Sequence, residues 1–214
     1  MNLFPKTKNI YSKINSKTMK LGDLRKIAKE IKKDHAMAME LWSTGEFMPR
    51  LLAILIMDKK LLTQELIDNL DRDMHSHEMD ERTQLMDWLM ANQLSKDKKT
   101  VALMESWENS PSALQRRIFW YYQARLWWMG QAPPPNTDQL LNSIEDRIAN
   151  EQPEVQWAMN FTAGQIGIHQ PEYRLRCIAL GEQTGLYKDQ VVSKGCTPDY
   201  LPEFIAIEVA KREK

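Results

Sequence analysis

Apolar residues recur along most of this chain with the spacing of amphipathic helices. In the stretch that begins at Leu21, Leu24, Ile27, Ala28 and Ile31 lie three or four residues apart, and the cationic side chains lie mostly on the other face. Nothing alternates at period two for long enough to predict a strand. The pattern therefore predicts an all-α protein of about ten helices, each of roughly 8–18 residues.

Capping residues and prolines predict where these helices begin. Asp34, Thr63 and Ser112 precede apolar-periodic stretches as N-caps, and Pro153 and Pro171 suit the first turn of a helix. Short helices that share no heptad favour an α-solenoid or an irregular bundle over a four-helix bundle. The predicted helices, besides the one that begins at Leu21, cover approximately 35–42, 46–57, 63–70, 78–90, 99–107, 112–129, 137–149, 153–168, 171–185 and 203–210.

The helix within Ser110–Met129 (SPSALQRRIFWYYQARLWWM) is the richest in arginine and aromatic residues. At about 100° per residue, one face carries Leu114, Ile118, Tyr121, Tyr122, Trp128 and Met129, and the other carries Arg116, Trp120, Gln123 and Trp127. Two interpretations remain open. The second face can be an exposed stripe of guanidinium and indoles that receives an anionic, aromatic polymer. Alternatively the helix packs on both sides and its tryptophans belong to the core, which spacing alone slightly favours.

The charge is zero overall but unevenly distributed. Residues 1–33 carry ten lysines and arginines against Asp23 and Glu30, a net charge of +8, so the rest of the chain sums to −8. A neutral total can hide a basic face and does not exclude nucleic acid as a partner. We interpret residues 1–20 as a basic arm, either extended or loosely helical or a disordered tail, and residues 21–210 as one domain.

Other features predict a cytoplasmic protein that does not associate with a membrane. Two cysteines, Cys177 and Cys196, are too few for a disulfide framework, and the N-terminus lacks the apolar stretch of a signal peptide. The longest apolar run, Leu51–Met57, is far too short to span a bilayer.

No nucleotide-binding, zinc-protease or nucleophile-elbow motif is present. His75 and His77 lie near acidic residues, but their spacing of two is poor for a metal site on a helix, so a solvated acidic turn is the favoured interpretation. We expect neither a metal nor a cofactor. Glu78 and Glu81 share a helix face and could do acid–base work, although acidic residues are common at helix N-termini because of the helix dipole.

Five stretches together resemble the AlkD-type DNA alkylation repair family, whose fold consists of HEAT-like helical repeats. The resemblance runs from Leu21 to Ile207, and its order and spacing are more specific than any single motif. The stretches are LGDLRKIAKEIKK (21–33), GEFMPRLLAILI (45–56), LQRRIFWYYQ (114–123), VQWAMNFTAGQIGI (155–168) and GCTPDYLPEFI (195–205). The resemblance implies a HEAT-like α-solenoid of antiparallel helix pairs with a concave face.

The resemblance also implies an activity. It predicts a DNA glycosylase that grips alkylated duplex DNA and releases N3- or N7-alkylated purines, without a cofactor and without flipping the base into a pocket. A carboxylate stabilises the cation that forms on the sugar. The alternative is a non-catalytic helical-repeat module that binds DNA or a protein partner. We expect a monomer in either case.

The departures from the family pattern fall on its functional positions. Arg116 matches the family's functional arginine, but His77 replaces a tryptophan, Phe161 replaces a second tryptophan, and Gly164 replaces an arginine. The catalytic aspartate becomes Glu81 or, with a slip of one residue, Asp80. The residues expected to contact DNA are Arg116, Arg117, Trp120, Phe161, His77, Arg50, Arg25, Lys26 and Lys29.

Overall fold

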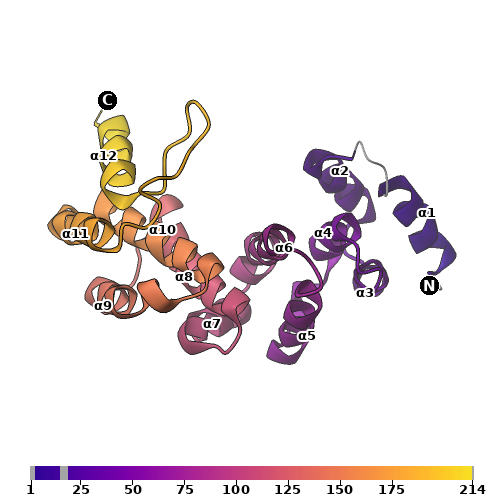
Figure 1. Cartoon of the computed structure of the whole chain (residues 1–214). Helices are drawn as coiled ribbons and strands as arrows, with labels where there is room; N and C mark the ends of the chain where they lie inside the picture. Colours follow the sequence, from indigo (N-terminus) through magenta and orange to yellow (C-terminus); the bar gives the residue numbers. More distant parts are fainter. Residues whose placement is uncertain (1–2, 15–18, 214) are drawn as a thin grey trace. The chain divides into compact units, whose positions relative to one another are not determined.

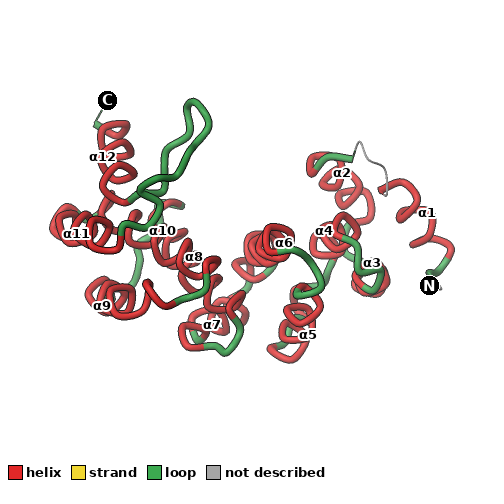
Figure 2. The backbone as a smooth tube through the Cα atoms, viewed as in Figure 1, coloured by secondary structure: helices red, strands yellow, loops and turns green. Residues whose placement is uncertain are grey.

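All regular structure in the computed structural model, which describes residues 3–14 and 19–213, is helical (Figure 2). The predicted all-α class is therefore confirmed. The basic arm contains one helix, α1 (Pro5–Ile14), while its residues 1–2 and 15–18 lie outside the described part. None of the described helices is both long enough and apolar enough to cross a membrane.

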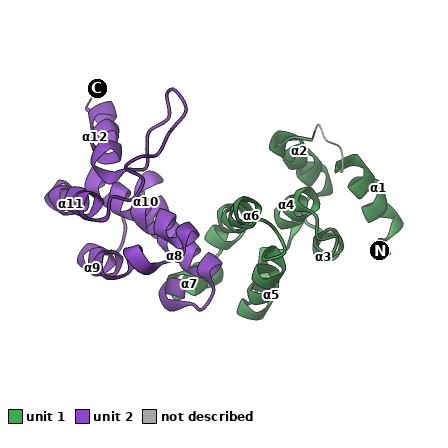
Figure 3. Cartoon of the chain, in the orientation of Figure 1, with its two compact units in different colours: residues 1–106 green, residues 107–214 purple. Residues whose placement is uncertain are grey.

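The chain forms two compact units, Met1–Ser106 and Trp107–Lys214 (Figure 3). Each unit has its own buried core. That residues 21–210 act as a single domain remains a prediction.

The first unit is organised around α4, which buries five aliphatic side chains of the run Leu51–Ile56. Helix α4 packs against α3 on one side and against α2 and α6 on others, so α2, α4 and α6 follow one another as neighbours (Figure 1). The helices after α1 are α2 (Leu21–Ile31), α3 (His35–Trp42), α4 (Phe47–Ile56), α5 (Gln64–Met74), α6 (Met79–Asn92) and α7 (Lys98–Glu105), with short 3-10 turns at Lys59–Leu61 and Leu94–Lys96.

The second unit is organised around two long helices, α8 and α10, that pack against each other. Helix α12 then packs on α10 and α11. The elements are α8 (Ala113–Trp128), α9 (Thr137–Arg147), α10 (Pro153–His169), α11 (Arg174–Thr184) and α12 (Leu201–Arg212), with 3-10 turns at Trp107–Asn109, Ile148–Asn150 and Pro171–Tyr173.

The helix starts predicted at Asp34, Thr63 and Ser112 agree with the structure because each depends on a local hydrogen bond. Asp34 accepts from the backbone N–H of Met37 at 3.0 Å, and Thr63 and Ser112 cap α5 and α8 in the same way. The helix predicted from Pro171 differs slightly, since it opens with a 3-10 turn before α11.

Helix α8 packs on both sides, in agreement with the second interpretation of its sequence. Trp120 has no exposed surface, and Gln123 and Trp127 are also buried. At the end of the helix the sequence pattern was wrong, because it placed Trp128 and Met129 on the apolar face with Leu114 and Ile118. In the structure these two residues are 55% and 51% exposed. Both residues lie at the end of α8, where the chain turns into the loop at Gly130. Their side chains therefore face solvent and not the core.

Candidate functional site

The structure brings together two of the residues that depart from the family pattern. Glu81 lies in the first turn of α6, and its Oε2 accepts a hydrogen bond at 2.7 Å from Nδ1 of His77, which lies four residues earlier in the bend before the helix. The His77 side chain is only 6% exposed, whereas that of Glu81 is 45% exposed. Asp80, the alternative carboxylate, is exposed beside it. The N-terminus of a helix favours negative charge, so the dipole of α6 stabilises both carboxylates.

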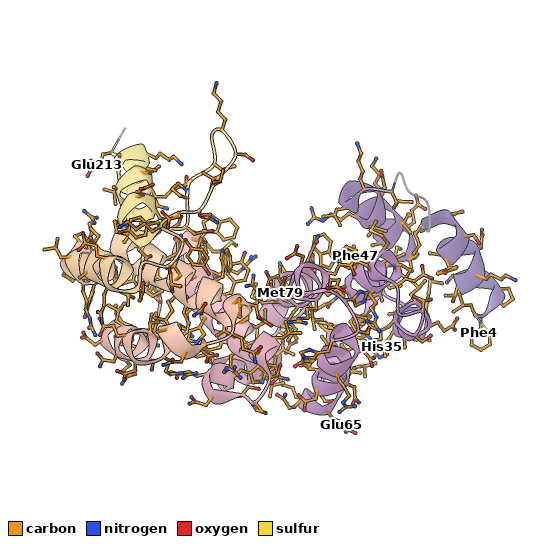
Figure 4. All side chains as sticks on the ribbon, in the orientation of Figure 1. Phe4, His35, Phe47, Glu65, Met79 and Glu213 are labelled. Atoms are coloured by element: carbon orange, nitrogen blue, oxygen red, sulfur yellow. The ribbon has the colours of Figure 1, made fainter. Side chains whose placement is uncertain are left out.

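Packing holds the imidazole of His77 in place. The ring of Phe47, the first residue of α4, meets it edge-on with centroids 6.1 Å apart. Figure 4 labels Phe47 and Met79, the first residues of α4 and α6. A carboxylate accepts hydrogen bonds, so the bond to Glu81 assigns the proton to Nδ1. The other ring nitrogen, Nε2, is buried and has no hydrogen-bond partner among the described residues.

A cation lies on the same side of α6 as Glu81. Trp88 comes seven residues after Glu81, so the two share one side of the helix at an axial distance of about 10 Å. The guanidinium carbon of Arg25, on α2, lies 4.7 Å from the centroid of the Trp88 ring. The indole N–H of Trp88 donates to the carbonyl of Leu51 at 3.2 Å, which fixes the ring against α4.

Arg25 begins a row of exposed cations on α2. Arg25 and Lys29 lie one turn apart on α2, Lys32 is the residue that ends the helix, and none of the three forms an ion pair with a described residue. Two other lysines are engaged, since Lys26 pairs with Asp23 at 3.4 Å and Lys33 pairs with Asp58 at 3.0 Å. We call Arg25, Lys29 and Lys32 the α2 row. It is the part of this surface best suited to bind phosphate.

Arg50 is a correction to the predicted set of DNA contacts. It is 5% exposed and donates to the backbone carbonyl of Asp73 at 2.7 Å and to the hydroxyl of Ser76 at 3.2 Å. Its guanidinium also lies 4.9 Å from the ring of Trp42. Burial lowers the pKa of Arg50, and Asp73 partly offsets this. The side chain therefore joins α3 and α4 to the end of α5 and is removed from contact with DNA.

In the second unit, Arg116 is held by an intramolecular ion pair. Its Nε and Nη2 donate to the two oxygens of Glu151 at 3.0 and 2.9 Å, and its Nη1 donates to the carbonyl of Ser110 at 2.7 Å. Arg147 donates to the same carboxylate at 3.1 Å. Burial would raise the pKa of Glu151, but the hydrogen bonds from Arg116 and Arg147 outweigh it and lower that pKa.

Phe161 belongs to a stack of side chains from three helices. Arg117 lies 4.6 Å over the ring of Trp157, which stacks on Phe161 at 5.2 Å with an interplanar angle of 7°. Phe204, on α12, meets the other side of the group at 6.0 Å from Phe161. Arg117 is buried and donates to the carbonyl of Glu154 at 2.8 Å. Arg117 and the ring of Phe161 thus both contact other side chains of the second unit. The DNA contacts expected of these two residues remain predictions.

Trp120 is the second correction, because a fully buried indole cannot contact DNA. The change at Gly164 also has a structural explanation. A Cβ at this position would lie 2.6 Å from the ring of Phe204, so Phe204 fills the space into which an arginine would extend. The close approach of α12 to α10 thus depends on this glycine.

The predicted site residues fall into two groups. The first unit holds Arg25, Lys26, Lys29, Arg50, His77, Asp80 and Glu81, and the second holds Arg116, Arg117, Trp120 and Phe161. The sequence pattern did not single out Trp88, Glu151, Trp157 or Phe204. Two of these carried a usable signal, since Trp88 lies two helical turns after Glu81 and Trp157 lies one turn before Phe161.

Most of the chain matches one family of known proteins. A family model described as "DNA alkylation repair enzyme" matches residues 10–184. The chain belongs to this family. In this DNA alkylation repair family member, α2 to α11 lie within the matched range, whereas α12 and Phe204 lie beyond it. No curated protein matches the chain.

A solved structure confirms the fold of this family member. It is described as "A new family of proteins related to the HEAT-like repeat DNA glycosylases with affinity for branched DNA structures". The TM-score is 0.69 at 20% sequence identity, with 98% of this chain and 89% of that chain covered. The predicted HEAT-like repeat fold is therefore confirmed.

Proposed function

We propose that this family member binds alkylated duplex DNA and releases N3- or N7-alkylated purines slowly. One observation carries the proposal. The partly exposed carboxylate of Glu81 and the cation of Arg25, held over Trp88, lie on the same side of α6. A carboxylate for the sugar and a cation for a phosphate are thereby presented on one side of α6.

The release of an alkylated purine requires few catalytic groups from the protein. An alkylated purine carries positive charge and leaves readily from its sugar, so the protein must bind the duplex and stabilise the cation that forms on the sugar. Glu81 supplies that negative charge, and Asp80 is the alternative. The α2 row binds phosphates and fixes the register of the DNA without reading its sequence. His77 cannot offer the face of an indole, which supports an activity lower than that implied by the family pattern.

Release of free base from duplex DNA that contains N7-methylguanine tests this function. Glu81→Gln keeps the shape and removes the charge, so it should lower the rate of release by about a hundredfold and leave the Kd for DNA unchanged or slightly lower, because a carboxylate repels phosphate. Asp80→Asn should have a smaller effect. Full release by the double variant Glu81→Gln/Asp80→Asn would refute the assigned role.

A second candidate function is that of a DNA-binding module without catalysis, with branched DNA as its ligand. The observation that favours it is the engagement of Arg116 by Glu151, which occupies the arginine that matches the family pattern. The similar solved structure belongs to proteins described as having affinity for branched DNA. Tighter binding of a four-way junction than of a linear duplex, without base release, would establish this function. Absence of DNA binding at low salt would favour a protein partner instead.

We also propose that the protein acts as a monomer in the cytoplasm. Two cysteines without a disulfide are typical of a reducing compartment. Light scattering at micromolar concentration should give the mass of one chain, 25.1 kDa. A mass of twice that value would contradict the monomer.

A further inference from the structure

We propose that His77 is a positioning residue that compensates for the longer side chain of Glu81. The inference rests on the proposed function, because it concerns how the carboxylate is placed beside the sugar. It treats the two departures from the family pattern, His77 for a tryptophan and Glu81 for an aspartate, as one coupled change.

The place of Glu81 on α6 determines where its carboxylate can reach. Glu81 is the third residue of the helix, where a glutamate commonly bends back to the backbone N–H of the N-cap residue. In this helix the N-cap residue, Glu78, makes no side-chain cap bond, and the Oε2 of Glu81 binds the imidazole of His77 instead. The bond draws the carboxylate back toward the start of α6. The bond thereby offsets the one methylene by which the side chain of Glu81 is longer than that of an aspartate.

The two side chains of the pair differ in burial. His77 is almost fully buried against Phe47, whereas nearly half of the Glu81 side chain is exposed. A packed donor therefore holds an exposed acceptor, and the position of the carboxylate follows from the position of the ring. The second oxygen of Glu81, Oε1, makes no hydrogen bond to a described residue and stays available to a developing positive charge.

The buried Nε2 of His77 shows that the orientation of the ring is imposed by its surroundings. A nitrogen that is buried without a partner costs free energy, and the ring would avoid this cost if it were free to turn toward solvent. The packing against Phe47 and the bond to Glu81 together select this orientation. The bond to Glu81 therefore requires a proton on Nδ1 of His77, which can be observed directly.

Two substitutions of His77 separate the hydrogen bond from the packing. His77→Phe keeps an aromatic ring against Phe47 and removes the donor. His77→Asn removes the ring but keeps a donor, because the amide nitrogen of asparagine is as many bonds from Cβ as Nδ1 of histidine. His75→Phe is the matched control, since His75 also lies one helical turn from a carboxylate, Asp71, but is exposed and makes no contact with Glu81.

The measurements are the rate of N7-methylguanine release at saturating DNA, the Kd for the same duplex, and the imidazole nitrogen chemical shifts. A displacement of about an ångström can cost roughly a hundredfold in rate. We expect His77→Phe to lower the rate by at least about tenfold with the Kd within about twofold. His77→Asn should recover most of the rate, and His75→Phe should match the wild type. In the wild type, the shifts should show a proton on Nδ1 that becomes exchange-broadened in Glu81→Ala.

Each alternative result is decisive. A normal rate in His77→Phe, or equal loss in His77→Phe and His77→Asn, overturns the positioning role, while a loss in Glu81→Gln leaves the proposed function intact. If the wild type releases no base, the proposed catalysis fails, and the nitrogen shifts alone decide the inference. A proton on Nε2 with none on Nδ1, or one on Nδ1 that is insensitive to Glu81→Ala, overturns it.

Discussion

The guanidinium of Arg116 binds both carboxylate oxygens of Glu151, at N–O distances of 3.0 and 2.9 Å. Bidentate geometry of this kind is also the geometry in which arginine binds phosphate. A DNA phosphate must therefore compete with Glu151 for Arg116. The side chain that matches the family's functional arginine is present but is neutralised within the second unit.

The first prediction concerns this competition. Glu151→Gln should raise the affinity for duplex DNA by about threefold to tenfold, because it removes a competing charge from Arg116. The double variant Arg116→Ala/Glu151→Gln should lack that gain. Kd values measured by fluorescence anisotropy check it. Identical affinities in all three proteins would assign Arg116 a purely structural role.

The second prediction concerns the pH dependence of stability. The pKa of Glu151 is lowered in the folded protein, so its ion pairs stabilise the fold above the ordinary value of 4.5 and lose this effect as the pH falls toward the lowered pKa. At pH 7, Glu151→Gln should reduce the free energy of unfolding by about 1–3 kcal/mol. Urea unfolding from about pH 7 to about pH 3.5 should show the difference from wild type narrowing below pH 4.5. If the free energies of unfolding of the wild type and Glu151→Gln differ by the same amount at every pH, the stabilising role assigned to the ionised Glu151 is wrong.

The third prediction concerns the α2 row. Alanine at Arg25, Lys29 and Lys32 should weaken DNA binding and reduce the slope of log K against log salt by about 0.9 for each phosphate that is no longer neutralised. Alanine at Lys6 and Lys33 is the control, because these lysines are already paired with Asp34 and Asp58. The control variant should keep most of the wild-type slope of log K against log salt. Equal effects of the two sets would show that position on α2 does not matter.

The fourth prediction concerns the approach of α12 to α10. Gly164→Ala places a Cβ 2.6 Å from the ring of Phe204 and should cost about 1–3 kcal/mol of stability. Phe204→Leu in the same chain should recover part of this loss. Gly22→Ala is the control, since a Cβ there meets nothing within 4 Å, and it should stabilise α2 by up to about 1 kcal/mol. Thermal denaturation of these variants and the wild type provides the comparison.

The fifth prediction separates the two thiols. Cys177 is fully buried, and burial raises its pKa to about 12, whereas Cys196 is exposed. The native protein should therefore react with one equivalent of a thiol reagent at about pH 8, and Cys196→Ser should abolish that reaction. The denatured protein should react with two equivalents. Rapid labelling of Cys177 in the native state would contradict the tight packing of α11.

The sequence by itself determined those features that depend on neighbouring residues. The helix starts at Asp34, Thr63 and Ser112 follow from a side chain and a backbone N–H a few residues away, so the local pattern was sufficient. Helix periodicity placed Glu78 and Glu81 on one helix face, and it did not single out the pair of His77 and Glu81. Their hydrogen bond was nevertheless not anticipated, because its formation depends on the packing of the ring against Phe47.

The tertiary structure decided which side chains remain available. Arg50, Arg116 and Trp120 have a cationic or aromatic pattern that is compatible both with a DNA surface and with a core. Their partners come from elements far along the chain, as with Arg116 and Glu151, which are 35 residues apart. Helix periodicity describes one element at a time and contains no information about the element that packs on its other face. Burial and ion pairing of these residues are therefore properties of helix packing, and only the assembled units reveal them.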